Sequence, residues 1–303
     1  MNKKHPITRY ILQGGVWWYA NCGFSHRSSV SFGQERSPKS APTTCTKRYH
    51  KKNKRVNYRE KHTKGFISNF IKSFWEFETA EKECQYEILP DGCFDLIFEI
   101  KNGQIHKVWL TGVWTQQIQI SIPKNTKLIG TRFKLISAEY LFKQSIKELK
   151  NTKTELSTPF MGCEHLDLND FGKFTDSISE QLQYGLKNLK EIDSRKFELF
   201  KILYERKGEI SVQELSERII WNSRQMNRYF NRHFGFSLKT FCKILKCHSS
   251  LKHIANGKLF PENDYYDQAH FIKQVKQITG STPTNLYLNK NDRFLQLTTI
   301  QSS

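Results

Sequence analysis

The residues best suited to bind a partner molecule lie between positions 222 and 232. Arginine and asparagine recur there at helical spacing, so one face of a predicted helix carries Arg224, Asn227, Arg228, Asn231 and Arg232. A guanidinium can bond the O6 and N7 atoms of guanine together, and a carboxamide can bond the N6 and N7 atoms of adenine. This face could therefore contact base edges in duplex DNA.

Two short predicted helices around a tight turn would position these side chains. Ser211 and Glu214 have the spacing of a capping box, which opens the first helix. A turn at Ile220-Trp221 follows, and either Asn222 or Ser223 caps the second helix.

The second predicted helix also has an apolar face, which should pack inward, and Gly235 should end this helix. Two such helices, with Arg and Asn outward on the second, form a helix–turn–helix whose second helix can enter the major groove. The pattern also fits a helical hairpin with an ordinary solvated face, so both interpretations stay open. The inward residues are Met226, Tyr229, Phe230 and Phe234.

Positive charge is in large excess and unevenly distributed. The 303 residues include 48 Lys or Arg and 29 Asp or Glu, which gives a net charge of +19. Such a bias favours an anionic partner, such as nucleic acid or a membrane surface. Residues 1–65 hold 15 of the basic and 2 of the acidic residues, and residues 211–303 hold 13 and 6. The chain between them is near neutral, which predicts a neutral module followed by a basic one.

The first 65 residues lack either apolar period and include the basic block 47–55. We predict a basic, disordered N-terminal extension over residues 1–65. Two alternatives are a phosphate-binding arm and a segment that is not a natural part of the mature protein. The apolar stretch 11–20 is interrupted by Gln-Gly-Gly, so a secretory signal is not expected. No run approaches the 18 or so apolar residues of a transmembrane helix, so no membrane association is expected.

Residues 66–205 are expected to form a β-rich regulatory module with trailing helices. Short strand-like runs separated by turn residues predict a small, mainly antiparallel barrel or sandwich. We expect a helix from about Ser137 with its apolar face at Ala138, Leu141, Phe142, Ile146 and Leu149, and a loop over 151–171. A further helix should start at the N-cap Ser194 and end at Gly208. The predicted strands are 86–89, 94–100, 106–110, 117–122 and 128–133.

No residue pattern points to catalysis or to a bound metal. The seven cysteines are scattered, without Cys-x-x-Cys or zinc-finger spacing, so we predict reduced thiols in a cytoplasmic protein, with no metal and no cofactor. A nucleophile elbow, a phosphate-binding glycine loop and a His-Glu-x-x-His motif are all missing, so the chain is not expected to be an enzyme. Trp109, Trp114 and Arg132 could line a small-molecule pocket, although such aromatic residues more often belong to a core.

Two separated segments resemble a known family. Residues 222–230 read Asn-Ser-Arg-Gln-Met-Asn-Arg-Tyr-Phe, followed by Phe-Gly-Phe-Ser at 234–237. Residues 265–272 read Tyr-Tyr-Asp-Gln-Ala-His-Phe-Ile, followed by Thr-Gly-Ser-Thr-Pro at 279–283. At this separation the segments resemble the paired helix–turn–helix signatures of the AraC/XylS regulator family, over about residues 206–290. Segments 88–98 and 130–133 are similar to the N-terminal domain of one subgroup of that family.

The resemblance implies a DNA-binding domain over residues 206–303, in which a long helix from about Leu238 to Ala255 joins two helix–turn–helix units. Each unit would insert a recognition helix into the major groove of double-stranded DNA. The resemblance also implies an activator with RNA polymerase as partner, and an N-terminal module that senses a small-molecule effector, forms a homodimer, or does both. The implied DNA-binding residues are Arg224, Gln225, Asn227, Arg228, Asn231 and Arg232 in the first unit and Gln268 and Lys273 in the second.

The second unit departs from the family pattern. Pro261 and Asp264 stand where a full helix ending in glycine is typical, so the first helix of this unit is expected to be shortened or absent. His270 lies between apolar neighbours, and we expect it to pack or cap rather than to bind a ligand.

Taken together, these patterns predict an α+β multidomain protein: a β-rich N-terminal, sensor-like module followed by an all-α bilobed double helix–turn–helix domain. The predicted function is sequence-specific DNA binding in transcription regulation. One alternative is a non-specific nucleic-acid binder driven by the basic extension. Another is a metabolite-binding protein with a vestigial helix–turn–helix.

Overall fold

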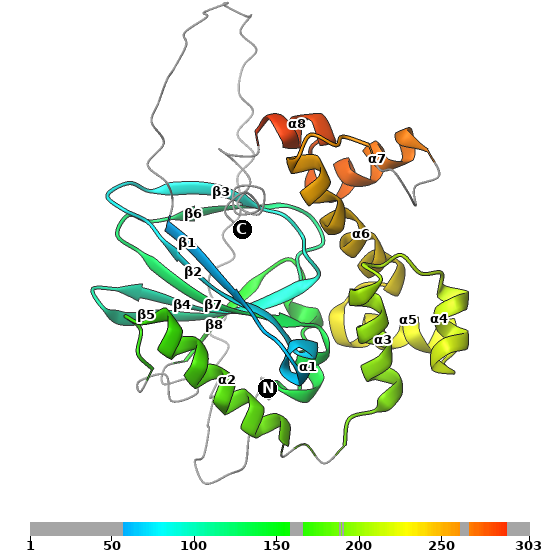
Figure 1. Cartoon of the computed structure of the whole chain (residues 1–303), viewed down its shortest axis with the longest axis horizontal. Coiled ribbons are helices and arrows are strands. Elements are labelled where there is room, and N and C mark those ends of the chain that lie inside the picture. The colour runs from blue at the N-terminus through cyan, green and yellow to red at the C-terminus, as the bar shows by residue number, and fades with distance from the viewer. Residues whose placement is uncertain (1–56, 158–165, 188, 190, 261–266, 290–303) are drawn as a thin grey trace, which may run out of the picture.

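The computed structural model describes residues 57–157, 166–187, 189, 191–260 and 267–289. Its strands precede nearly all of its α-helical residues, and the two parts lie side by side (Figure 1). The protein is therefore an α+β chain with a β-rich N-terminal part and an all-helical C-terminal part, as the sequence predicts. The strands are β1 (Asn57–His62), β2 (Ile71–Glu78), β3 (Cys84–Ile88), β4 (Cys93–Lys101), β5 (Gln104–Thr111), β6 (Ile118–Ile122), β7 (Lys127–Lys134) and β8 (Lys153–Leu156).

Two short 3-10 helices and one short α-helix accompany the strands, and the longer helices follow them. The short elements are η1 (Phe66–Asn69), α1 (Ile136–Tyr140) and η2 (Lys147–Leu149). The longer part comprises α2 (Phe171–Lys187), α3 (Ser194–Glu205), α4 (Val212–Ile219), α5 (Ser223–Phe234), α6 (Leu238–Ala255), α7 (Gln268–Thr279) and α8 (Pro283–Leu288).

The strands form a six-stranded sheet in the order β1-β2-β7-β4-β5-β8 and a separate pair, β3-β6. Every strand pair among the described residues is antiparallel, which confirms the expected strand arrangement. Trp75 of β2 lies opposite Gly130 of β7. A Cβ at position 130 would lie 2.1 Å from the Trp75 ring, so this position must be glycine for the indole to lie across β7.

Three parts of the fold differ from the sequence-based expectation. Strand β1 lies within residues 1–65, so the expected disorder does not hold for residues 57–62; residues 1–56 lie outside the described part. Strand β8 lies in the segment expected to be a loop. The helix expected from Ser137 is only the five-residue α1, because the chain turns away at Lys143, whose φ is 52°. The apolar residues predicted for its face are nevertheless buried or packed against the core.

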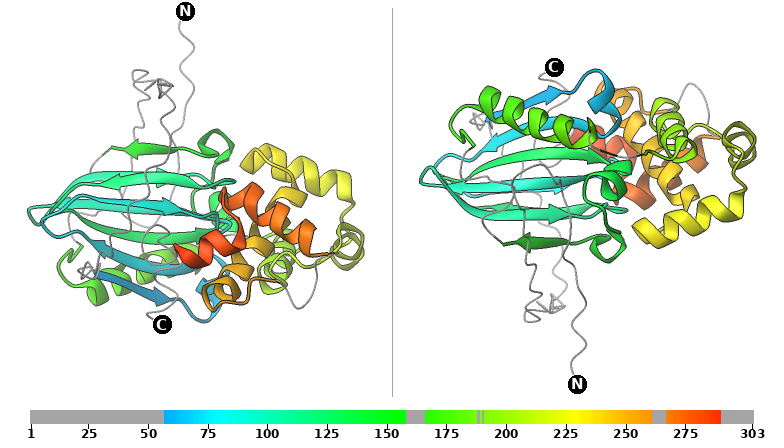
Figure 2. Two further views of the ribbon diagram at one scale, coloured as in Figure 1. Left: turned by 90° about the horizontal axis from the view of Figure 1, so that it is seen from above. Right: turned by 90° about the horizontal axis from the view of Figure 1, so that it is seen from below.

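Helix α2 packs along one side of the sheet (Figure 2). Phe174 of α2 meets Phe98 of β4 edge-on, with ring centroids 5.6 Å apart. The ammonium of Lys61 on β1 donates to Asp176 of α2 at 2.7 Å. The following helix, α3, begins one residue earlier than expected, because Asp193 rather than Ser194 is its N-cap and accepts from the Arg195 amide. Gly208 lies just beyond its end with a φ of 77°.

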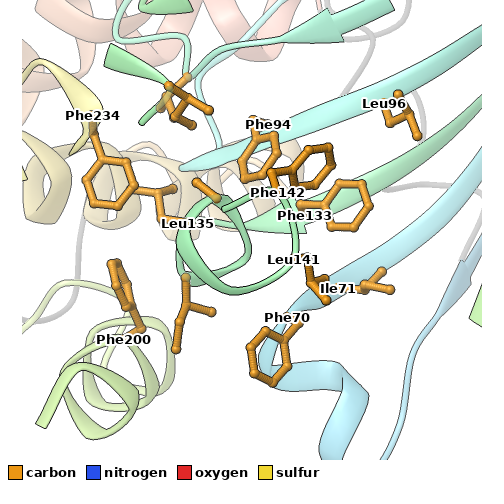
Figure 3. Packing of buried hydrophobic residues seen from close by; sticks show 14 of the residues in the cluster. Phe70, Ile71, Phe94, Leu96, Phe133, Leu135, Leu141, Phe142, Phe200 and Phe234 are labelled. Carbon is orange, nitrogen blue, oxygen red and sulfur yellow. The ribbon is translucent and has the colours of Figure 1, made fainter. Parts of the chain in front are cut away.

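The main hydrophobic core runs without interruption from the sheet into the helices (Figure 3). Phe94, Phe133 and Phe142 pack together on the sheet side, with centroids 5.0 to 5.4 Å apart. Phe200 of α3 and Phe234 of α5 extend the same cluster on the helical side, 5.9 Å apart. A second, smaller core holds α6, α7 and α8 together around Leu251, Phe271 and Leu286. Among the described residues, no helix combines the length and apolar composition needed to cross a lipid bilayer.

Candidate nucleic-acid interface

Helices α4 and α5 and the turn between them form the predicted helix–turn–helix. The hydroxyl of Ser211 accepts from the Glu214 amide at 3.0 Å, which caps α4. The turn passes through Ile220, whose φ of 53° and ψ of 48° are left-handed. Asn222, rather than Ser223, caps α5 by accepting from the Gln225 amide at 2.9 Å. The Gln225 side chain accepts in return from the Asn222 amide at 3.2 Å, which completes a capping box.

The apolar face of α5 fixes the direction of its polar face. Met226, Tyr229, Phe230 and Phe234 are buried, as predicted, and Gly235 ends the helix with a φ of 76°. Phe230 contacts Phe200 of α3, with centroids 5.8 Å apart. Because side chains three and four positions apart share a face, burying this set directs the remaining residues outward.

The outward face of α5 carries a row of three exposed arginines, Arg224, Arg228 and Arg232. They are four positions apart and so lie along one side of the helix. No carboxylate in the described part of the chain lies within ion-pairing distance of them. Three unneutralised guanidiniums on a helix about 12 Å in diameter match the width of the DNA major groove and the charge of its phosphates.

The two asparagines of this face are engaged with the backbone. Asn227 is half-buried; its Nδ2 donates to the Ser223 carbonyl at 3.1 Å, and its Oδ1 accepts from the Leu238 amide at 3.2 Å. Asn231 is exposed, and its Nδ2 donates to the Asn227 carbonyl at 2.9 Å. Asn227 therefore ties α5 to the first turn of α6. Helical spacing within α5 gave no sign of this tie, because Leu238 lies beyond the end of the helix.

The second helical unit consists of α6, α7 and α8. Helix α6 spans Leu238–Ala255, as expected for the long connecting helix. Asp267 caps α7 by accepting from the His270 amide at 2.6 Å, and the His270 side chain is exposed rather than packed inside. Gln268 and Lys273 are both exposed on α7. Five positions separate them, so they point roughly 140° apart around the helix and do not form a single row.

The segment between α6 and α7 bears on the expected loss of a helix in the second unit. Residues 256–260 contain no helix, and residues 261–266, with Pro261 and Asp264, lie outside the described part. Gly257 has a φ of 82°, a conformation that continues no right-handed helix. The described portion of this segment is consistent with a shortened or absent helix.

Charged and polar contacts join the β-rich part to both helical units. The Tyr229 hydroxyl donates to Glu139 of α1 at 2.8 Å, and burial together with this carboxylate raises the pKa of Tyr229. Glu139 also pairs with Lys196 of α3. The β-rich part therefore contacts the buried side of the helix that carries the arginine row.

A buried cluster of charges contacts α6. Arg132 Nε lies 3.3 Å from Asp91 Oδ2 and 3.2 Å from Asp95 Oδ1, while Lys72 Nζ lies 3.5 Å from Asp91 Oδ2. Burial opposes ionisation of Asp91, but the two cations outweigh it and lower its pKa. Lys72 Nζ also lies 3.4 Å from His248 Nε2 of α6. That contact requires a neutral imidazole, and burial together with Lys72 lowers the pKa of His248 to about 3.

Two of the three residues considered for a ligand pocket, Trp109 and Arg132, have separate partners. Arg132 belongs to the charged cluster, whereas the Trp109 indole donates to Glu99 at 3.1 Å and lies beneath the ammonium of Lys153. An open groove of about 560 Å³ lies elsewhere, between η1, α3 and the end of α4. No group of three or more His, Cys, Asp or Glu in the described residues is placed to hold a metal ion.

A family model matches the β-rich part of the chain, and two solved structures resemble a larger share of it. A family model described as a domain of unknown function, DUF6597, matches residues 64–155. No curated protein matches the chain. Among solved structures, an apo variant of ToxT from Vibrio cholerae has a TM-score of 0.38 at 10% identity, covering 71% of this chain and 97% of that one. A second ToxT structure from Vibrio cholerae has a TM-score of 0.34 at 8% identity, with 77% and 97% coverage. Likeness at this level assigns neither a family nor a function.

Proposed function

We propose that this chain is a sequence-specific, DNA-binding transcription regulator of the AraC/XylS type. The observation that carries the proposal is the row of exposed, unpaired arginines on α5, the capped second helix of a helix–turn–helix. The paired sequence signatures at 222–237 and 265–283 support the same function independently of that geometry.

In this proposal α5 enters the major groove and α7 enters the next segment of the groove. Arg224 and Arg228 bond guanine edges, since each has a free guanidinium fork. Gln225, Asn227, Asn231 and Arg232 complete the contacts of the first unit, and Gln268 and Lys273 supply those of the second. Because Asn227 already bonds two backbone groups, one amide hydrogen and one lone pair of Oδ1 are left for a base.

The β-rich part would modulate this binding. The contacts from α1 and the charged cluster to α5 and α6 give it a physical route to the recognition helices. The proposal extends to a small-molecule effector or a homodimer as the source of modulation. It also extends to an activator role in which RNA polymerase is the partner.

The test is selection of random duplex DNA by the full chain at about 150 mM salt, where non-specific binding is weak. A reproducible motif is expected from the wild type. The Arg224→Ala, Arg228→Ala double variant should lose that motif, whereas the control Arg206→Ala, an exposed arginine beyond the end of α3, should retain it. If folded wild-type protein enriches no motif, the proposal fails.

Deleting residues 1–56 separates this function from non-specific binding by the basic extension. The motif should survive the deletion if α5 recognises DNA. Loss of all DNA binding on deletion would instead identify the extension as the binding element. A metabolite that raises the melting temperature of a full chain without DNA affinity would support a metabolite-binding protein.

A further inference from the structure

The C-terminal end of α5 is anchored on the β-rich part. The hydroxyl of Ser145, in the segment between α1 and η2, lies 3.0 Å from the Arg232 carbonyl oxygen and 3.1 Å from that of His233. The Ile146 amide donates to the same His233 carbonyl at 2.9 Å. The final carbonyls of a helix have no partner within the helix, so these bonds satisfy groups that would otherwise face solvent.

The C-terminal end of α7 is anchored on the same part in the same way. The backbone amide of Gln117, just before β6, donates to the Ile278 carbonyl at 3.0 Å. The Gln117 side chain, with its amide nitrogen turned inward, donates to the Thr279 carbonyl and to Glu87 Oε2, the latter at 3.2 Å. A Cβ at Gly280 would lie 2.6 Å from the end of the Gln117 side chain, so the two segments are in close contact.

An apolar contact reinforces the second anchor. Leu89, which follows β3, is 1% exposed and belongs to the small core formed by α6, α7 and α8. Through Leu89 and Gln117, the β-rich part contributes both an apolar and a polar contact to the second helical unit.

The connections along the chain would fix α6 relative to α5, but they would not fix α7. Between α5 and α6 there are three residues, Gly235 to Ser237, and Asn227 bonds across them. Between α6 and α7 there are twelve residues, whose described part, 256–260 and Asp267, contains no helix. The direction of α7 relative to α5 therefore depends on packing contacts, which are those with α6 and α8 in the smaller core and those with the β-rich part.

We propose that the β-rich part fixes the spacing and angle between α5 and α7, and we call this role the brace. Gln117 is the positioning residue of the anchor that holds α7. This inference rests on the proposed function, because the spacing matters only if both helices contact DNA. Its consequence is that the β-rich part, without contacting DNA, determines how many base pairs separate the two halves of the site.

The test compares Gln117→Ala with Gln119→Ala in the full chain. Gln119 is the matched control, since its side chain also donates to Glu87, at 3.3 Å, but it is exposed on β6. After a two-part motif is selected with the wild type, affinity is measured on sites whose halves are moved apart or together by one and two base pairs. One base pair shifts the second half by about 3.4 Å and turns it by about 35°.

We expect the wild type and Gln119→Ala to lose at least about tenfold in affinity per inserted base pair, and Gln117→Ala to lose less than about threefold. Hydrogen exchange of α7 amides without DNA should be faster in Gln117→Ala alone. An unchanged spacing penalty in Gln117→Ala overturns the brace. A wild-type motif with only one part also overturns it but leaves the proposed function intact, whereas no motif at all overturns the proposed function.

Discussion

Replacing Arg228 by alanine tests whether the arginine row contacts bases or only phosphates. The side chain is exposed and has no ion-pair partner among the described residues, so its removal should change the free energy of unfolding by less than about 0.5 kcal/mol. Any loss in binding then belongs to the complex. A bidentate contact to guanine contributes about 1–3 kcal/mol of discrimination, which corresponds to a roughly 5- to 150-fold loss on the selected site.

The assay measures affinity for the selected site and for sites with single base substitutions, each over a range of salt concentrations. If Arg228 contacts a base, Arg228→Ala should lower the affinity for the selected site and leave the affinity for one substituted site almost unchanged. Arg228→Lys should lower the affinity for the selected site in a similar way, since lysine keeps the charge but not the fork of donors. An equal loss on every sequence, with the slope of log affinity against log salt reduced by about 0.9, would refute base contact and make Arg228 a phosphate ligand.

Three further predictions concern stability. Asn227→Ala should lower the free energy of unfolding by about 1 kcal/mol in urea titrations, since the Leu238 amide loses its acceptor. An unchanged urea midpoint would show that the bond between Asn227 and Leu238 does not stabilise the fold. Ile220→Asn should raise the free energy of unfolding by about 1 kcal/mol, because a β-branched residue is strained at a φ of 53° and this side chain is 87% exposed. A lower melting temperature of this variant would contradict the prediction. The third concerns pH: with the pKa of His248 lowered to about 3, the unfolded chain binds this proton first as pH falls below about 6.5. The free energy of unfolding should therefore fall between pH 6.5 and 3, by at most about 1.4 kcal/mol per pH unit from this group. His248→Asn should flatten this dependence on pH. The control His253→Asn, at an exposed position on α6, should leave it unchanged.

The sequence predicted elements whose signal is local. Strands β3 to β7 have alternating or continuous apolar runs between turn residues, and the caps of α4 and α5 follow from residue type and spacing. The local signal failed where tertiary contacts decide. Strand β1 is polar and mostly exposed, and its pairing with β2 and the bond from Lys61 to α2 cannot be seen in its own residues.

The sequence predicted which side of α5 carries the exposed arginines, but not which residues of the β-rich part bond the ends of α5 and α7. Burial of Met226 and Phe230 on one side of α5 places the arginines on the other, which periodicity alone predicts. The bonds from Ser145 and Gln117 to the ends of α5 and α7 join residues about 88 and 161 positions apart, so they produce no periodic pattern in the sequence. Such contacts depend on the folded arrangement of two separate parts of the chain.

The continuous core has a consequence for cooperativity of unfolding. Buried side chains form one cluster from Ile67 in η1 to Leu245 in α6, passing through the helix–turn–helix without a break. The β-rich part and the first helical unit should therefore melt together in one transition, although the sequence divides them near residue 206. The second helical unit, around its smaller core, is the segment that can open on its own at lower free energy. A preparation cut at residue 206 would expose the aromatic side of α5 to water and lose the cooperativity that keeps the first unit folded.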